Sequence, residues 1–362
     1  MSRAGKLFFI CVFSLAAFGI VMTYSASAIY AERAYRDPQF LLVRQTIYVL
    51  LGVVLFFMTA SLRPEFWQGH ARKLGLLSLA CLALVFVPKV GHLAGGAQRW
   101  IGLGLFNFQP AEFAKLGACI YLSDYLSRKT KEIKKGNLTI FIPPLMLVGM
   151  MSVLLLLQPD LGSTAFIALM TFLLFFLSGI RVVYVAGVIS AALPVFYFLV
   201  IRVPYRLSRV TAYLNPWEDP QGSGFQMIQS LLAFGLGGVQ GAGLGQSTQK
   251  LFYLPSGYND FIFAIIGEEL GLIGTLCVVG VYFTLFLCGM TMAAKAKNDF
   301  QRLTISSLTL LIVFQAIVNM MVATGLVPTK GLPLPFLSYG GTSVVMNLIA
   351  TGIILSMDRT KP

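Results

Sequence analysis

Long apolar runs dominate the pattern of hydrophobic and polar positions along this chain. A run of about 20 apolar residues crosses a bilayer core of roughly 30 Å as a helix, and ten such runs occur, near 7–28, 40–62, 74–90, 112–128, 139–157, 161–179, 183–201, 261–290, 303–326 and 338–357. We therefore predict an all-α, polytopic inner-membrane protein with ten transmembrane helices, both termini on the same side, and a single domain over 1–362. The first run is too long for the core of a cleavable signal peptide, so we expect an uncleaved helix.

Composition and charge support this class and set an orientation. Apolar residues make up 57% of the chain, charged residues 11%, and the mean hydropathy is +0.80, which leaves too little polar surface to cover a soluble globule. The 27 Lys and Arg residues, against 14 Asp and Glu, lie mostly in short loops. The positive-inside rule explains them better than nucleic-acid binding does. With cytoplasmic termini, 16 basic residues fall inside and 10 outside, or 6 outside when the long loop 202–260 is discounted.

Residues 202–260 form the longest polar interruption of the chain. The orientation above makes this loop extracytoplasmic. Within it, 225–234 carries apolar residues on one helical face and Gln226 and Gln229 on the neighbouring one, a pattern typical of an interfacial or re-entrant helix. The glycine-rich run 235–245 lacks the spacing of a dinucleotide-binding motif and indicates a flexible turn rather than a phosphate cradle.

Asp260 ends the long loop and stands at the start of the eighth apolar run. A carboxylate there either caps the helix, where the helix dipole favours it, or serves as an outward-facing base, and the residue alone does not decide between the two. At 100° per residue, four small residues share its helix face. They form a narrow groove that either packs against another helix or holds a lipid chain: Ala264, Gly267, Gly271 and Gly274.

Two further acids lie in the same apolar run. Glu269 falls on the opposite helix face from Asp260, and Glu268 lies about 80° away, so neither pairs with Asp260 through helix geometry. Charged groups at membrane depth are costly and persist mainly where they are paired or functional. We expect a buried ion pair for one of them, with Lys115 as the candidate partner, or a part in proton movement or conformational change.

Other candidate binding residues lie in predicted outside loops. Arg99 and Trp100 place a cation beside an aromatic plane, which either anchors the membrane interface or meets a phosphate and a sugar. The cations Arg206, Arg209 and Lys330 also face outside. The two histidines lie on opposite sides, and the five cysteines lie inside apolar runs without CxxC spacing, so we predict no metal cluster.

Seven motifs occur in the order that one family shows: 19–27 (GIVMTYSAS), 98–101 (QRWI), 109–115 (QPAEFAK), 158–162 (QPDLG), 215–220 (NPWEDP), 260–271 (DFIFAIIGEELG) and 328–335 (PTKGLPLP). Through them the chain resembles the SEDS family (shape, elongation, division and sporulation) of bacterial peptidoglycan glycosyltransferases. The first and last motifs are similar to the FtsW-like cell-division branch rather than the RodA-like elongation branch. Tyr258 and Asn259 stand where the family often shows His-Thr, which weakens any role for those two side chains.

The resemblance implies an enzyme of the bacterial cytoplasmic membrane that polymerises lipid II, the undecaprenyl-pyrophosphate disaccharide-pentapeptide, at the division septum. It implies Asp260 as the essential carboxylate and the general base of an inverting transfer. Several cations would offset the charge of the leaving pyrophosphate, namely Arg206, Arg209 and Lys330. The remaining substrate-binding candidates are Arg99, Trp100, Gln226 and Gln229. No cofactor is implied with certainty, and a Mg²⁺ or Mn²⁺ ion stays open.

Two other functions stay open on the residues alone. Ten spans with intramembrane acids also describe a lipid II flippase or a proton-coupled transporter, although polar residues gathered in one outside loop favour the enzyme. A scaffold for division proteins is compatible with catalysis. Because the outside segments are too short to hold a crosslinking domain, we expect a class B penicillin-binding protein as partner. It should dock on spans eight and nine through small residues, our candidates being Gly280, Gly289, Ala293 and Ala316.

Overall fold

The computed structural model describes residues 1–94, 97–102, 107–180, 204–251, 253–255, 257–329 and 331–358, and the single residues 187, 190 and 197. Nine predicted spans form helices within these ranges: α1 (Arg3–Tyr35), α2 (Phe40–Ser61), α3 (Pro64–Leu84), α4 (Pro110–Arg128), α6 (Ile142–Leu157), α7 (Leu161–Leu177), α11 (Ile262–Ala294), α12 (Asp299–Ala323) and α13 (Gly341–Met357). All but three residues of the predicted span at 183–201 lie outside the described residues. Among the described residues, five segments are long and apolar enough to cross a membrane: α1, α2, Leu138–Leu157, α11 and α12.

Helix starts follow from local side-chain chemistry. Pro64 and Pro110 occupy the first turns of α3 and α4, where a missing N–H costs no helical hydrogen bond. Asp160 caps α7 by accepting a hydrogen bond from the Ser163 amide at 2.9 Å. Asn298 caps α12 in the same way. These residues end the loops and fix where each helix enters the bundle.

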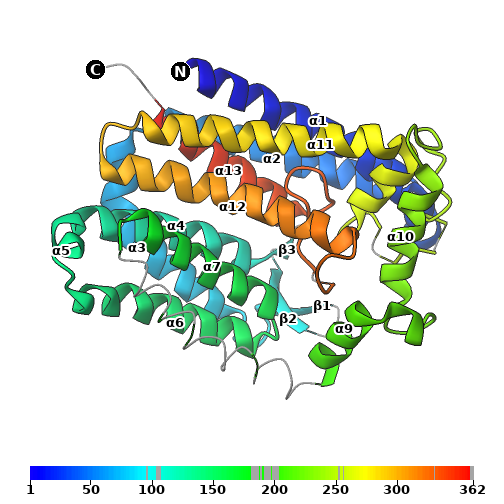
Figure 1. Cartoon of the computed structure of the whole chain (residues 1–362), viewed down its shortest axis with the longest axis horizontal. Coiled ribbons are helices and arrows are strands. Elements are labelled where there is room, and N and C mark those ends of the chain that lie inside the picture. The colour runs from blue at the N-terminus through cyan, green and yellow to red at the C-terminus, as the bar shows by residue number, and fades with distance from the viewer. Residues whose placement is uncertain are drawn as a thin grey trace.

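Two groups of helices build the bundle, as Figure 1 shows. One apolar core lies mainly among α1, α2, α11, α12 and α13, and a second lies mainly among α3, α4, α6 and α7. Helix α12 packs against α4 and α7 and so joins the two groups. Helices α2 and α13 pack closely along their length, whereas α3 packs on α4 and α6.

The two ends of the bundle carry different loops. The Ser2 amide donates a hydrogen bond to the Asp358 carboxylate at 2.8 Å, so both ends of the described chain meet. The basic loop with α5 (Thr130–Lys134) lies at that end, and α9 (Pro204–Leu214) and α10 (Phe225–Gly237) lie at the other (Figure 1). The predicted topology groups these loops in the same way. Short 3₁₀ turns complete the connections at η1 (Leu138–Phe141) and η2 (Pro216–Glu218).

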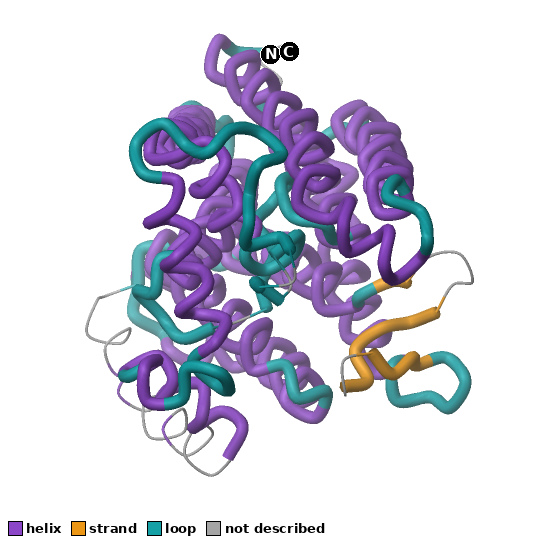
Figure 2. The backbone as a smooth tube through the Cα atoms, turned by 90° about the vertical axis from the view of Figure 1, so that its right-hand side faces the viewer, coloured by secondary structure: helices purple, strands orange, loops and turns teal. Residues whose placement is uncertain are grey.

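A small antiparallel sheet connects α3 to α4 in the order β1 (Gly91–Ala94), β2 (Ala97–Gly102) and β3 (Asn107–Phe108). His92 pairs with Trp100 across the first two strands, and Figure 2 shows the strands at the edge of the helical bundle. The all-α prediction is therefore wrong in this loop. Strand pairing satisfies backbone hydrogen-bonding groups in this non-helical segment.

Helix α11 is interrupted at Gly271, whose φ of 67° and ψ of −163° are not helical. The glycine-rich stretch supplies the hydrogen bonds that the helix loses there. The Leu272 amide donates to Gly238 O at 2.9 Å, and the Ala242 amide donates to Glu268 O at 2.9 Å. Irregular backbone at membrane depth is tolerated where protein satisfies it. Amides of the glycine-rich stretch thus hold α11, which argues against a phosphate cradle.

Candidate active site

Asp260 lies just before α11 and does not cap it. The helix begins at Ile262, its N-cap residue is Phe261, and no side chain makes a capping hydrogen bond. The capping interpretation of Asn259 or Asp260 is therefore wrong, because the chain makes one more turn before the helix starts. The half-buried Asp260 carboxyl group is not used to start the helix.

Asn319 of α12 fixes the backbone at Asp260. Its Nδ2 donates to Asp260 O at 2.9 Å and to Leu332 O at 2.7 Å. The side chain is 1% exposed, so water does not compete for these bonds. One amide group thus joins the Asp260 segment to the loop between α12 and α13.

The same loop holds the two residues before Asp260. Ser338 Oγ donates to Asn259 O at 2.6 Å, and the Tyr339 amide donates to Tyr258 O at 3.0 Å. Gln45 of α2 reaches the loop from the other side, with Nε2 donating to Ser338 O at 3.2 Å. Helix α2, helix α12 and the loop therefore define the position of the Asp260 segment.

Gly331 and Arg209 lie beside the carboxyl group. A Cβ on Gly331 would lie 3.3 Å from Asp260 Oδ2, so the loop passes close to the acid. Arg209 of α9 donates from Nη1 to Thr329 O at 3.0 Å. Burial raises the pKa of Asp260 to about 6, and the Arg209 charge opposes part of that rise. The result is a carboxylate of raised basicity with a cation nearby.

Small residues on the Asp260 face of α11 pack against protein. A Cβ on Gly267 would lie 2.4 Å from the Phe234 ring of α10, and a Cβ on Gly271 would meet the glycine-rich stretch. Ala264 is fully buried. Over Ala264, Gly267 and Gly271 this face is a close contact with protein, and the alternative of a groove for a lipid chain is wrong there. Gly274 is half-exposed, and a Cβ on it would meet only Leu270 of the same helix.

Glu268 binds the turn that precedes Lys250. Its carboxylate accepts hydrogen bonds from the Ser247 hydroxyl, from the Thr248 amide at 2.8 Å and hydroxyl at 2.7 Å, and from the Gln249 amide at 3.3 Å. Backbone amides satisfy a buried carboxylate without a cation. Glu268 therefore anchors the outer loop to α11.

Glu269 forms a buried ion pair, but not with Lys115. Lys250 Nζ lies 3.0 Å from Glu269 Oε1, with side-chain exposures of 8% and 0%. Ser25 of α1 also donates to this carboxylate at 2.7 Å. The predicted buried ion pair is present, but the predicted partner is wrong. The cation comes from Lys250 of the loop, and Lys115 of α4 pairs with Glu112 instead.

Lys115 pairs within its own helix. Its Nζ lies 2.7 Å from Glu112 Oε1 and donates to Gln315 Oε1 of α12 at 3.3 Å. Gln315 Nε2 in turn donates to Pro333 O at 3.0 Å. This buried chain of contacts links α4 to the same loop that carries Gly331.

Arg99 and Trp100 lie on β2, away from the contacts around Asp260. Arg99 donates from Nε to Gln158 O at 3.0 Å and from Nη2 to Pro159 O at 2.5 Å. It therefore ties the sheet to the corner between α6 and α7. Trp100 is half-buried, and neither residue contacts Asp260 in the described part of the chain.

The structure says less about the other predicted site residues. Gln226 and Gln229 are half-buried on α10, which packs on α11. Arg206 lies on α9, and its side chain is outside the described residues, as is the whole of Lys330. Of the predicted cations, Arg209 is the one that the described structure brings to Asp260.

Comparison with known proteins shows the family. The FtsW/RodA/SpoVE family, described as cell cycle protein, matches residues 5–362. The chain belongs to this family. A probable peptidoglycan glycosyltransferase FtsW of Geobacter sulfurreducens is 43% identical over 345 residues, which cover 95% of this chain and 92% of the relative. Stage V sporulation protein E of Bacillus subtilis is 39% identical over 344 residues, covering 94% and 93%.

Two solved structures share the fold. One belongs to a peptidoglycan synthase complex described for its structural coordination of polymerization and crosslinking. It matches with a TM-score of 0.79 and 31% identity over 97% of this chain and 96% of that one. The rod shape determining protein RodA of Thermus thermophilus matches with a TM-score of 0.71 and 28% identity, over 97% and 95%.

Sequence reasoning missed the residues of this family member that position Asp260. Asn319 and Gln315 both hold the loop between α12 and α13, and Ser338 holds Asn259. Two amides four residues apart in an apolar span share one helix face, and that spacing was the available signal. As for metal, no cluster of three or more His, Cys, Asp or Glu side chains occurs among the residues that the structure describes.

Proposed function

We propose that this chain is a peptidoglycan glycosyltransferase that polymerises lipid II into glycan strands during septal cell-wall synthesis, with Asp260 as general base. Family membership and two relatives named as probable peptidoglycan glycosyltransferases, at 42–43% identity, support the reaction class. One structural observation carries the role of Asp260: its carboxyl group caps no helix and lies beside Arg209.

The proposed reaction is a single inverting displacement. The 4-hydroxyl oxygen of the acceptor GlcNAc attacks the anomeric carbon of the donor, the bond from that carbon to the pyrophosphate oxygen breaks, and Asp260 takes the hydroxyl proton. The bonding electrons leave with undecaprenyl pyrophosphate. With a pKa of about 6, Asp260 is mostly ionised at pH 7 and is a stronger base than an exposed aspartate of pKa about 3.9.

Cations would stabilise the leaving pyrophosphate. Arg209 already lies near Asp260, and we propose that Arg206, on the same helix, and Lys330, next to Gly331, join it when substrate binds. Arg99 donates to two carbonyl groups, so we assign it to shaping the sheet. Trp100, Gln226 and Gln229 stay candidates for sugar contacts.

The buried acids fit the enzyme better than a proton-coupled carrier. Glu112 and Glu269 have lysine partners, and Glu268 has amide and hydroxyl donors. Such contacts hold loops in place, and breaking one would leave a charge buried without compensation. We therefore favour the polymerase over the flippase or transporter.

The chain is a multi-pass membrane protein. We propose cytoplasmic termini, an extracytoplasmic loop 202–260 and a location at the division septum, from the distribution of basic residues. Cysteines placed at 223 and 134 test this topology with a membrane-impermeant label in intact cells. Labelling of the first alone is expected, and the reverse pattern would overturn the placement of Asp260.

A class B penicillin-binding protein is the proposed partner, and the structure changes the expected docking face. Three of the four small residues are packed inside the bundle, because Gly289 meets Thr309 and both alanines are buried: Gly289, Ala293 and Ala316. Gly280 has open space around it. We therefore move the proposed docking face to the side of α11 around Gly280, where Leu276 and Phe283 are each 59% exposed.

Purified protein with lipid II, alone and with its transpeptidase, tests the proposed function. Glycan strands resolved on a gel are the expected product. Movement of lipid II across vesicle membranes without any polymer would instead support the flippase. Absence of both, from protein that is monodisperse and heat-stable with its partner bound, would leave the scaffold and overturn the proposal.

A further inference from the structure

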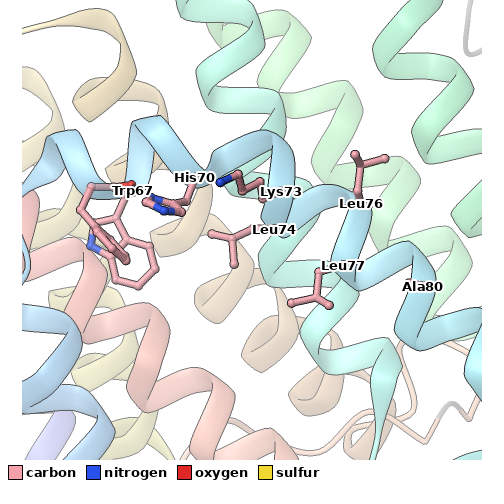
Figure 3. A pocket seen from close by; sticks show the side chains of 8 residues that line it. Trp67, His70, Lys73, Leu74, Leu76, Leu77 and Ala80 are labelled. Carbon is pink, nitrogen blue, oxygen red and sulfur yellow. Dashed lines mark hydrogen bonds between the residues drawn. The ribbon is translucent and has the colours of Figure 1, made fainter.

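A shallow, open groove of about 590 Å³ lies along α3, and the described residues that line it all belong to that helix. Figure 3 shows Trp67, His70, Lys73, Leu74 and Leu77 following one another along this helix. A second cavity of about 210 Å³, between α2, α3, α4 and α13, shares Trp67 and Leu74 with the groove. Its lining includes none of the residues that contact Asp260 in the described chain.

Polar and apolar side chains follow one another in order along the groove. The aromatic residues Phe66 and Trp67 come first, His70 and Lys73 follow, and Leu77 and Ala80 lie beyond. Lys73 is exposed, whereas Leu77 is an exposed apolar side chain, with 53% of its surface accessible. This order of residue types is typical of a helix that passes from the membrane–water interface, where aromatic and basic side chains gather, into the bilayer core.

One basic side chain on the groove suits a phosphate. Lys73 is exposed, and its ammonium group carries three donors. His70, one turn before it, is committed to the helix, because its Nδ1 donates to Phe66 O at 2.9 Å. Arg72 is also exposed nearby. An anionic headgroup over this turn would meet basic side chains, and a neutral one would forgo that attraction.

We propose that this groove binds an anionic phospholipid, with the phosphate at Lys73 and an acyl chain along Leu74, Leu77 and Ala80. The lipid would cover apolar surface of α3 that the helices of the described ranges leave exposed, since α3 packs mainly on α4 and α6. The second cavity, which shares Trp67 with the groove, lies between helices of the two groups. The site is independent of the proposed polymerase activity.

The position of the groove argues against the polyprenyl tail of the proposed substrate. α1 starts at the end of the bundle where Ser2 meets Asp358, α2 returns to that end, and α3 starts there. The basic end of the groove therefore lies at the end of the bundle opposite to α9 and α10 (Figure 1). A lipid whose headgroup reacts at Asp260 would place its phosphate at the other end.

Quenching of Trp67 fluorescence tests the proposal. The chain has three tryptophans, so a variant with Trp100→Phe and Trp217→Phe reports on Trp67 alone. It is reconstituted with phosphatidylglycerol or phosphatidylcholine carrying brominated acyl chains. We expect phosphatidylglycerol to quench at about fivefold lower mole fraction, the ratio that corresponds to about 1 kcal/mol for one basic residue near an anionic headgroup, and we expect 0.5 M salt to reduce the difference.

Three further samples decide between the outcomes. Lys73→Gln should remove the preference for phosphatidylglycerol, whereas Lys295→Gln, the same change at an exposed residue after α11, should keep it. Ala80→Phe should weaken quenching by both lipids by filling the groove. Equal quenching by the two lipids in the parent, or a Lys73→Gln variant that keeps the preference, would overturn the proposal. Displacement of the brominated lipid by undecaprenyl phosphate at equimolar amounts would assign the groove to the substrate tail and also overturn it.

Discussion

Replacing Asn319 with leucine should displace Asp260 without changing its chemistry. The substitution removes the hydrogen bonds of 2.9 and 2.7 Å to Asp260 O and Leu332 O. Each contributes about 1 kcal/mol net, and an abandoned buried carbonyl costs more. Part of this loss is offset, because Asn319 Oδ1 is buried and receives no hydrogen bond from the described residues, and leucine removes that unsatisfied oxygen. We expect a net destabilisation of about 2 kcal/mol, with a Tm lower by a few degrees.

The effect on catalysis should exceed the effect on stability. A displacement of about 1 Å in a reacting group can reduce a rate about 100-fold, so polymerisation by Asn319→Leu should fall by one to two orders of magnitude at a temperature where the protein stays folded. Asn347→Leu is the control, because Asn347 is equally buried but donates only to Ser343 within its own helix. A lowered Tm with an unchanged polymerisation rate would refute the positioning role of Asn319.

Three further changes probe the acid, the kink and the ion pair. Since burial raises the pKa of Asp260 to about 6, the polymerisation rate should fall about tenfold per pH unit below 6 and level off above 7; a flat profile from pH 5 to 8 would contradict this. Gly271→Ala, at a φ of 67°, should lower the Tm and the yield, whereas Gly280→Ala on the same helix, with open space around it, should not. Lys250→Met should lower the free energy of unfolding by about 3–5 kcal/mol, because it leaves the Glu269 carboxylate without its cation. Adding Glu269→Leu should restore most of that loss. A Lys250→Met variant as heat-stable as the wild type would show that the pair contributes nothing to stability.

The sequence allowed prediction of the helices and of the segment that holds the candidate site. Apolar runs of bilayer length mark the spans directly, and the end of the polar loop marks Asp260 as the candidate base. Motif resemblance brought in the segment 328–335, and the structure does place Gly331 against Asp260. These features are local, or depend on composition along the chain.

Features that depend on contacts between distant segments could not be predicted in this way. The helix wheel for α11 assumed a continuous helix, which Gly271 interrupts. Glu269 takes Lys250 from a loop and Ser25 from another helix, and no spacing in the sequence identifies either. Most of the small residues chosen for docking are packed inside the bundle. Periodicity shows which residues share a helix face, but it does not show which helix or lipid covers that face.

The Asp260→Asn variant tests the central claim most directly. Asparagine keeps the shape but accepts no proton, and general base catalysis contributes about 10²–10⁴-fold. Folding raises the pKa of this acid, so its ionised form opposes folding, and stability falls as the pH rises from about 4 through 6. At pH 7 the amide should therefore not lower the Tm and would stabilise by up to about 3 kcal/mol.

The measurement is the rate of glycan-strand formation from lipid II by purified Asp260→Asn, with its transpeptidase, beside the wild type. Glu32→Gln, which removes an exposed carboxylate from α1, is the control and should retain wild-type rates. We predict a folded Asp260→Asn protein with at least about a 100-fold lower rate. Strand synthesis within a few-fold of the wild type would contradict the assignment of Asp260 as the base.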